Sequence, residues 1–208
     1  MARYIDAVCR LCRRSGQKLM LKGERCFTPK CGVERRSAPP GQQVQRRRKV
    51  SDRGIQLREK QKARYIYGLL ERQFRKTFRE AERRPGKTGE NLLQLLETRF
   101  DSIVLQLGFA DSRAQARQIV RHGHLTVNGK RANIPSMRLN AGDTIGWREG
   151  SKKSEYFKEL VETIKSKSSP DWLSVDKENI SGRVISLPTG EDFQPTFDES
   201  VIIAYYSR

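Results

Sequence analysis

The sequence contains no run of about 18 apolar residues, so we expect no helix that crosses a membrane. Its first residues, MARYIDAVCRL, lack the apolar segment of a secretion signal, so we expect the protein to stay in the cytosol. The catalytic signatures G-x-x-x-x-G-K-[ST], G-x-S-x-G and H-E-x-x-H are absent, and the two histidines have no evident nucleophile beside them. Nothing in the sequence therefore argues for an enzyme.

Acidic side chains are scarce in the first half of the chain. Residues 1–90 carry 26 Lys or Arg against 9 Asp or Glu, a net charge of +17, whereas residues 91–208 carry 16 against 15. A surface that neutralises phosphate groups has such an excess, so we expect the first half to bind a polyanion. An anionic membrane surface is the lesser competitor, because basic amphipathic helices also bind anionic lipid.

Cysteine is absent after residue 31. The four cysteines, in the spacing C-x2-C-x13-C-x4-C, are Cys9, Cys12, Cys26 and Cys31. In a reducing cytosol such a cluster favours metal ligands over disulfides, and two pairs of thiolates can close a tetrahedron. We predict one zinc, with an iron–sulfur cluster as the alternative, since four thiolates serve both. Free buried thiols and a redox C-x-x-C pair are less favoured. The arginines that could offset the thiolate charge while facing a phosphate backbone are Arg10, Arg13, Arg14 and Arg25.

A basic segment without apolar periodicity follows the cysteines. Residues 33–54 mix Pro, Gly and Gln with the run Arg46, Arg47, Arg48 and Lys49. Such a segment cannot bury enough surface to fold alone, so we expect an extended arm that becomes ordered on a polyanion.

Two helices are predicted next. The first begins near Ser51 or Asp52 and ends at Gly68, and the second has an apolar stripe of Leu70, Phe74 and Phe78. The cations largely off that stripe are Arg72, Arg75, Lys76, Arg79 and Arg83. PGKTG, at 85–89, predicts a loop and a domain boundary.

Residues 91–148 have the pattern of one compact α+β module. One core helix is predicted from 91 to Gly108, and a second helix begins at a capping box of Ser112 and Gln115 and ends at Gly123. Asn128-Gly129 predicts a β-hairpin, and AGDTIGW a further turn and strand. The apolar positions of the first helix are Leu92, Leu96, Phe100, Ile103 and Leu107.

Arg113, Arg117 and Arg121 recur every four residues, so they should share one helix face. No acidic residue at helical spacing could pair with them, which favours a phosphate-contacting face over an ordinary solvated one. The basic side chains that follow the helix or leave the hairpin turn are His122, His124, Lys130 and Arg131.

The last part of the chain is mildly acidic, with 8 basic and 10 acidic residues in 151–208, and should not be the main nucleic-acid surface. Residues 152–167 predict an amphipathic helix, and WLSV, GRVISL and SVIIAYY predict short strands. The residues expected to face inward from the helix are Phe157, Leu160, Val161 and Ile164.

The segment RFDSIVLQLGFADSRAQARQIVRHGHLTVNGKRANIPS closely resembles the RNA-binding module named after the bacterial small-subunit ribosomal protein S-four family. MARYIDAVCRLCRR, LKGERCF, PPGQ, LREKQKARYIYGLLERQFRKTF and the final YYSR resemble other segments of that family, in its order. The likeness covers essentially the whole chain. Pseudouridine synthases and some tRNA synthetases carry the module beside a catalytic domain, for which this chain has no remaining length.

The resemblance implies a non-enzymatic primary binder of small-subunit ribosomal RNA, in the 5′ domain, that nucleates subunit assembly and contributes to translational accuracy. It implies a neighbour, ribosomal protein number five, and a place in the cytoplasmic small subunit without a membrane partner. Some relatives bind their own mRNA, but no motif here carries that over. The rivals are an RNA-modifying enzyme and a free regulatory RNA binder.

The expected fold is α+β in three parts. Residues 1–45 form a four-cysteine metal knuckle and basic arm, residues 46–90 a helical domain completed by a tail of about 190–208, and residues 91–189 the inserted module with a small antiparallel sheet. The candidate RNA-binding residues are Arg3, Arg10, Arg13, Arg14, Arg46, Arg47, Arg48, Lys49, Arg58, Lys62, Arg72, Lys76, Arg113, Arg117, Arg121, His122, His124, Lys130 and Arg131.

Overall fold

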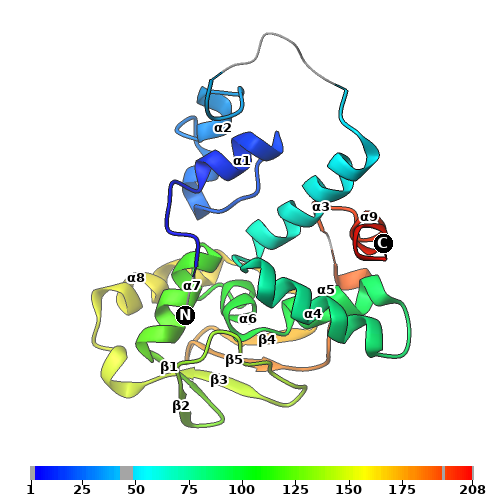
Figure 1. Ribbon diagram of the computed structural model, residues 1–208. Helices are drawn as coiled ribbons and strands as arrows, with labels where there is room; N and C mark the ends of the chain where they lie inside the picture. The colour runs from blue at the N-terminus through cyan, green and yellow to red at the C-terminus, as the bar shows by residue number, and fades with distance from the viewer. Residues whose placement is uncertain (1–2, 43–48, 194, 208) are drawn as a thin grey trace. The chain divides into compact units, whose positions relative to one another are not determined.

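The structure, a computed structural model, describes residues 3–42, 49–193 and 195–207. The chain divides into two compact units, drawn in Figure 1. Unit 1 takes the described parts of residues 1–92 and 194–208, and unit 2 is residues 93–193. We expected the boundary in a loop at 85–89, but a helix begins at Thr88 and the units divide inside it, after Leu92.

Unit 1 is helical throughout its described regular elements. Helix α3 begins where sequence predicted, since the Ser51 hydroxyl accepts a hydrogen bond from the Gly54 N–H at 3.2 Å. The predicted apolar stripe of α4 is confirmed, with Phe74 and Phe78 buried. The helices of unit 1 are α1 (Cys9–Ser15), α2 (Gly32–Arg35), α3 (Asp52–Ile66), α4 (Glu71–Arg83), the first half of α5 (Thr88–Glu97) and α9 (Glu199–Tyr206), with a 3₁₀ turn at Gly23–Phe27.

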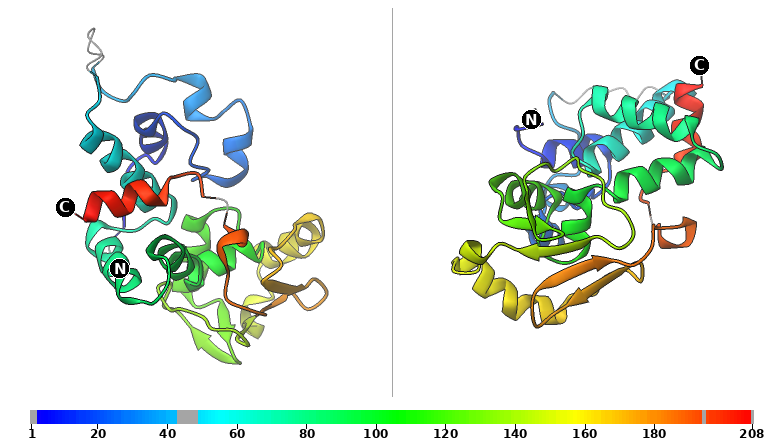
Figure 2. Two further views of the ribbon diagram at one scale, coloured as in Figure 1. Left: turned by 90° about the vertical axis from the view of Figure 1, so that its right-hand side faces the viewer. Right: turned by 90° about the horizontal axis from the view of Figure 1, so that it is seen from below.

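Helix α9 replaces the strand that SVIIAYY predicted. Asp198 caps it, because its carboxylate accepts hydrogen bonds from the Ser200 and Val201 N–H groups at 2.8 and 3.3 Å. The helix lies alongside α3 (Figures 1 and 2), and the Tyr206 ring stacks on Phe78 with centroids 4.5 Å apart. The cap and this tertiary packing outweigh the β-propensity of Val, Ile and Tyr.

Unit 2 packs helices against one antiparallel sheet with the strand order β2-β1-β3-β5-β4. Its helices are the second half of α5, α6 (Phe100–Gln106), α7 (Arg113–His122) and α8 (Glu155–Thr163), with 3₁₀ turns at Glu149–Ser151, Ile164–Ser166 and Gly190–Asp192. Its strands are β1 (Leu125–Val127), β2 (Lys130–Ala132), β3 (Thr144–Trp147), β4 (Leu173–Asp176) and β5 (Ser181–Val184). The mixed helix and antiparallel-sheet class is therefore confirmed.

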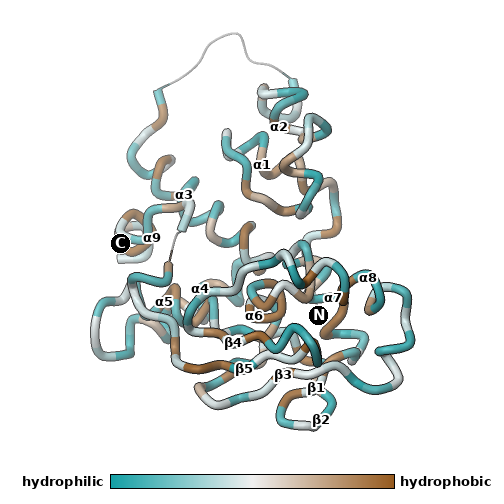
Figure 3. The backbone as a smooth tube through the Cα atoms, turned by 180° about the vertical axis from the view of Figure 1, so that it is seen from behind, coloured by the Kyte–Doolittle hydropathy of each residue, from teal (hydrophilic) through white to brown (hydrophobic). Residues whose placement is uncertain are grey.

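One hydrophobic core joins the helices of unit 2 to the sheet. Helix α6, one of the hydrophobic stretches in Figure 3, buries Phe100 and Ile103 completely, and its C-cap residue Leu107 is 2% exposed. A Cβ added to Gly182 of β5 would lie only 2.6 Å from the Leu107 methyl groups. Strand β5 therefore needs glycine at this point, because α6 packs directly on its backbone.

The prediction of a single core helix over 91–108 is wrong, because the helix is interrupted between α5 and α6. Arg99 is extended, with φ −66° and ψ 141°, and forms an isolated bridge with Arg138. The Thr98 carbonyl accepts from the Leu139 N–H at 3.0 Å, and the Phe100 N–H donates to the Met137 carbonyl at 2.8 Å. These bonds to a segment almost 40 residues away compete with helical ones, and no local pattern reveals them.

The predicted hairpin is confirmed, with Asn128 at φ 50° and Gly129 at φ 76° between β1 and β2. The capping box is half formed. The Ser112 hydroxyl accepts from the Gln115 N–H at 3.3 Å, but the Gln115 side chain accepts from the Asp111 N–H at 2.8 Å instead of from Ser112. Helix α7 ends at Gly123 as expected, in the left-handed conformation.

Candidate nucleic-acid interface and metal site

The outer face of α4 carries five exposed cations. Phe74, Thr77, Phe78 and Ala81 occupy the buried side of this helix, so the cations between them point outward. The exposed cations are Arg72, Arg75, Lys76, Arg79 and Arg83. Within the described part of the chain, no ion pair joins any of these five to a carboxylate. Such unpaired, solvent-facing charges suit phosphate groups.

Helix α3 presents fewer cations than expected. Lys62 is 8% exposed and donates to Glu59 at 2.6 Å, so it is not an open surface cation, and its contact with phosphate stays a prediction. Lys60 is 3% exposed and donates to Glu71 at 2.7 Å. Buried ammonium groups need such partners, since an unpaired charge away from water is costly. Arg58 remains exposed.

The expected arginine stripe of α7 is not a single exposed face. Arg117 is 6% exposed, and its guanidinium lies 3.9 Å from the Asp101 carboxylate on α6. The same carboxylate accepts two hydrogen bonds from Arg99, at 3.0 and 2.9 Å. The acidic partners that seemed missing at helical spacing come from another helix.

The other two members of the stripe differ from each other. Arg113 is half-buried and donates to Glu97 at 3.2 Å and to the Ser102 hydroxyl at 3.4 Å. Arg121, in the last turn, is exposed. Only this end of the stripe is free to meet phosphate.

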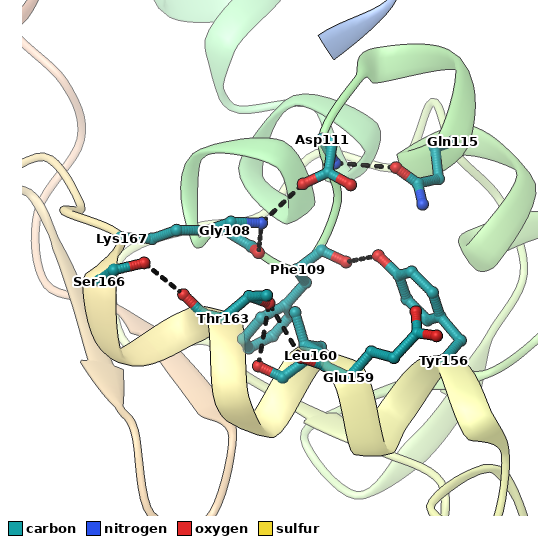
Figure 4. A network of polar contacts seen from close by, with 10 residues as sticks. All are labelled: Gly108, Phe109, Asp111, Gln115, Tyr156, Glu159, Leu160, Thr163, Ser166 and Lys167. Carbon is teal, nitrogen blue, oxygen red and sulfur yellow. Dashed lines mark hydrogen bonds and ion pairs between the residues drawn. The ribbon is translucent and has the colours of Figure 1, made fainter. Parts of the chain in front are cut away.

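The turn between α6 and α7 is held by the segment that contains α8 (Figure 4). The Lys167 ammonium donates to the Gly108 carbonyl at 3.1 Å and to the Asp111 carboxylate at 2.7 Å. The Tyr156 hydroxyl donates to the Phe109 carbonyl at 2.8 Å. These bonds satisfy carbonyls that the end of α6 leaves without helical partners, and so fix where α7 begins.

A basic cluster gathers where α7 ends and the hairpin begins. His122, Lys130 and Arg131 are exposed, and the Arg131 guanidinium lies so close to Gly123 that a Cβ there would be 2.4 Å from its Nε. His124 is half-buried, with Nδ1 3.0 Å from the Ser151 hydroxyl. Burial lowers the pKa of His124, and the positive charges of His122, Arg131 and Arg148 lower it further. The fold thus brings the four predicted basic residues together.

The predicted N-terminal arginines are partly exposed and partly bound within the fold. Arg3, Arg10 and Arg14 are exposed. Arg13 instead donates to the Ala38 carbonyl at 2.9 Å and to the Pro39 carbonyl at 3.4 Å, so it ties the cysteine region to the segment that follows. Lys49 is exposed, and the predicted residues Arg46, Arg47 and Arg48 lie outside the described residues.

All four cysteines line one small pocket in unit 1. Gly32 is required there, because a Cβ would lie 2.9 Å from the Cys9 Cβ and 3.3 Å from its sulfur. The Lys22 N–H donates to the Cys26 sulfur at 3.4 Å. Burial raises the pKa of the Cys12 thiol and the other three cysteines add to the rise, opposed by a hydrogen bond from the Leu19 backbone. In the described residues, no three His, Cys, Asp or Glu side chains have an arrangement that could hold a metal ion. The predicted metal knuckle is therefore not confirmed.

Comparison with known proteins identifies the family. The family model described as "Ribosomal protein S4/S9 N-terminal domain" matches residues 3–97, and the model described as "S4 domain" matches residues 98–145. "Small ribosomal subunit protein uS4" from Heliobacterium modesticaldum is 57% identical over all of both chains, and that from Pelotomaculum thermopropionicum is 54% identical over the same extent. "Small ribosomal subunit protein uS4A" from Alkaliphilus oremlandii is 55% identical, again over both whole chains.

The chain belongs to the uS4 family of small ribosomal subunit proteins. Membership at full length makes it a structural ribosomal protein with an RNA-binding role, not an enzyme. No helix in the described stretches is long and apolar enough to cross a membrane.

The S4-domain match of this uS4-family chain stops within β3, before much of unit 2. Strands β4 and β5 and helix α8 lie beyond it, yet they extend the sheet and hold the α6–α7 turn. Residues outside the matched domain therefore position residues within it.

Sequence reasoning missed Arg148 as a member of the basic cluster. Leu125 of β1 pairs with Trp147 of β3, and the Arg148 N–H donates to the His124 carbonyl at 2.9 Å, so Arg148 is exposed beside His124. The pairing of β1 with β3 is what would have revealed Arg148. The sequence predicted the two strands but not their register, so this pairing could not be read from it.

Proposed function

We propose that this protein binds small-subunit ribosomal RNA, in its 5′ domain, as a structural component of the cytoplasmic small ribosomal subunit. The observation that carries this is the α4 face, where five exposed cations without carboxylate partners lie over a buried apolar stripe. The basic cluster of His122, His124, Lys130, Arg131 and Arg148 provides a second contact surface, on unit 2, and the exposed Arg121 precedes it in the last turn of α7. Full-length similarity to small-subunit proteins supports the proposed RNA-binding function.

Within this function we propose that the protein nucleates subunit assembly and contributes to translational accuracy. A primary binder must recognise RNA without other proteins, and two cationic surfaces, one on each compact unit, suit that role. We propose ribosomal protein number five as its protein neighbour. Its own mRNA is a second RNA target to be tested, with no residue here assigned to it.

A paired charge reversal tests the α4 face. Arg72→Glu with Lys76→Glu should weaken binding to a 5′-domain transcript and flatten the log–log salt dependence by about 0.7–0.9 for each phosphate no longer contacted. The matched control is Lys158→Glu with Lys165→Glu, two exposed cations of the mildly acidic C-terminal part, and RNA binding should change little in it. Equal losses in both variants would contradict the proposed surface.

Sedimentation separates this function from its rivals. The protein should cosediment with small subunits in cell extract and should protect 5′-domain nucleotides from cleavage. A free regulatory RNA binder would remain at the top of the gradient. An RNA-modifying enzyme would leave altered nucleotides in ribosomal RNA fragments.

We also propose that Cys9, Cys12, Cys26 and Cys31 hold one zinc, with an iron–sulfur cluster as the alternative. Four thiols facing one pocket are the donor set that both groups take, and the Lys22 N–H already donates to one sulfur. The thiol side chains must turn to reach ligand positions. Bound zinc would offset only part of the charge of the four thiolates, leaving the rest to nearby arginines, and its binding energy would stabilise the N-terminal segment.

Elemental analysis of reduced, purified protein should find one equivalent of zinc or the iron of one cluster. Cys26→Ser should lose the metal and destabilise unit 1, whereas Ser15→Ala, a change nearby that removes no thiol, should keep it. Metal-free native protein with four alkylatable thiols would overturn this proposal.

A further inference from the structure

Phe27 is the one exposed phenylalanine of the eight in the chain. Its side chain is 75% exposed, whereas the other seven are buried or half-buried. The only other exposed aromatic residue among those described is Tyr4, at 39%. An aromatic ring left in water buries little area for the fold, so its flat face is available to stack on a partner.

The fold holds Phe27 outward on a well-anchored turn. Phe27 ends the 3₁₀ turn Gly23–Phe27, directly after the buried Cys26. The Arg25 carbonyl accepts hydrogen bonds from the Thr28 hydroxyl at 3.0 Å and the Thr28 N–H at 3.4 Å, and the Cys31 N–H donates to the Thr28 carbonyl at 2.9 Å. Exposure of the ring is therefore set by the backbone around it.

Three cations lie within five residues of Phe27 in the sequence. Lys22, Arg25 and Lys30 are exposed, and within the described chain none of them is paired with a carboxylate. Residues 3–42 carry 10 Lys or Arg against 3 Asp or Glu. A flat apolar ring with unpaired positive charges close to it in the sequence is complementary to an unstacked base with its flanking phosphates. A protein partner would need a larger continuous apolar area.

We propose that Phe27 is a stacking platform for one unpaired RNA base, with Lys22, Arg25 and Lys30 contacting the phosphates beside that base. This deepens the proposed RNA-binding function and rests on it. The aromatic ring supplies affinity that does not depend on salt, while the three cations supply the part that does. The turn that presents the ring is pre-formed, so little ordering is needed on binding.

Binding of the full chain to a transcript of the 5′ domain tests the proposal in three variants. Phe27→Ala should lower affinity about 5- to 150-fold, as expected for loss of one base–aromatic stack, and should leave the salt slope unchanged. Phe27→Tyr should retain affinity, because it keeps the ring. Phe27→Leu should lose it, because an aliphatic side chain is apolar but cannot stack. The control Ile5→Ala removes another exposed apolar side chain, 83% exposed, and should bind as wild type.

Thermal melting of every variant should match wild type, since Phe27 packs against little. Ultraviolet crosslinking of the wild-type complex should join a nucleotide to Phe27. Wild-type affinity in Phe27→Ala or in Phe27→Leu would overturn the stacking platform while leaving RNA binding intact. Failure of the wild-type protein itself to bind the transcript would instead defeat the proposed function.

Discussion

Asp101 lies between two buried arginines of unit 2. It accepts both hydrogen bonds of Arg99 and lies 3.9 Å from the Arg117 guanidinium, and its side chain is 4% exposed. A buried pair of this kind adds little stability compared with apolar residues, but removal of one partner leaves the other charge without compensation.

We therefore expect Asp101→Ala to lower the free energy of unfolding of unit 2 by about 3–5 kcal/mol. Urea denaturation monitored by Trp147 and Trp172 fluorescence measures this, since both tryptophans lie in unit 2. Arg121→Ala, an exposed change on α7, should stay within about 0.5 kcal/mol of wild type. A near-neutral Asp101→Ala would show that the arginines find other partners.

His124 offers a spectroscopic view of RNA binding. Its pKa is below the ordinary 6.5 because the ring is half-buried and three cations surround it. Phosphates that neutralise those cations should raise the pKa of His124, so the complex takes up a proton and affinity should increase as the pH falls through this range. Proton resonance titration of His124, free and bound, measures the shift. A pKa that stays unchanged in the complex would remove the basic cluster from the interface.

At the scale of elements, α9 completes unit 1 through Glu71. The Glu71 carboxylate on α4 accepts from Lys60 at 2.7 Å and from the Tyr206 hydroxyl at 3.0 Å. Arg53 lies 3.9 Å from the centre of the Tyr205 ring and donates to the Tyr205 carbonyl at 2.8 Å. The tail is thus joined to both α3 and α4 by polar as well as apolar contacts.

Docking of α9 should weaken in acid. Burial alone would raise the pKa of Glu71, but its hydrogen bonds with Lys60 and Tyr206 and the charge of Lys60 hold it below 4.5. The stabilisation is therefore present above the unfolded value of 4.5 and is lost as the pH falls through the lower folded value. Amide exchange of α9 as a function of pH measures this. In Glu71→Gln, amide exchange of α9 should respond less to acid than in wild type. The control Glu82→Gln, at an exposed position of α4, should respond as wild type does.

The elements that sequence predicted well are those fixed by neighbouring residues. The Ser51 cap, the stripe of Phe74 and Phe78, and Asn128-Gly129 are local signals, and all three are confirmed. The failures depend on distant contacts: the helix breaks at Arg99 because the chain pairs with Arg138. Likewise, SVIIAYY is helical because α3 and α4 cover it.

The candidate site follows the same division. Sequence could place Arg72 and Lys76 on an outer face, because the apolar period of one helix decides it. It could not show that Arg117 is buried, since the carboxylate beside it belongs to a residue 16 positions earlier, on another helix. The basic cluster was found except for Arg148, which only strand register brings next to His124.

At the scale of the whole molecule, charge and continuity separate the two units. Residues 88–193, which contain unit 2 and keep α5 whole, carry 15 Lys or Arg against 14 Asp or Glu. The large core cluster runs from Phe100 to Val184 and so lies entirely within this fragment. Unit 1 cannot be cut out as one continuous fragment, because it includes the C-terminal tail. Phe197 of that tail packs on Tyr67, with ring centroids 6.4 Å apart.

The fragment 88–193 should therefore unfold cooperatively by itself, and chelators should not affect it because it contains no cysteine. It should still bind a 5′-domain transcript through the basic cluster, but more weakly and with a flatter salt dependence than the full chain. Each phosphate that only unit 1 can neutralise contributes about 0.7–0.9 to the slope of the full chain, and the fragment lacks that contribution. The test is the log–log slope of RNA affinity against salt concentration, measured for the fragment and for the full chain. A fragment with the slope of the full chain would place the phosphate contacts in unit 2, and the cationic face of α4 would then be a solvated surface only.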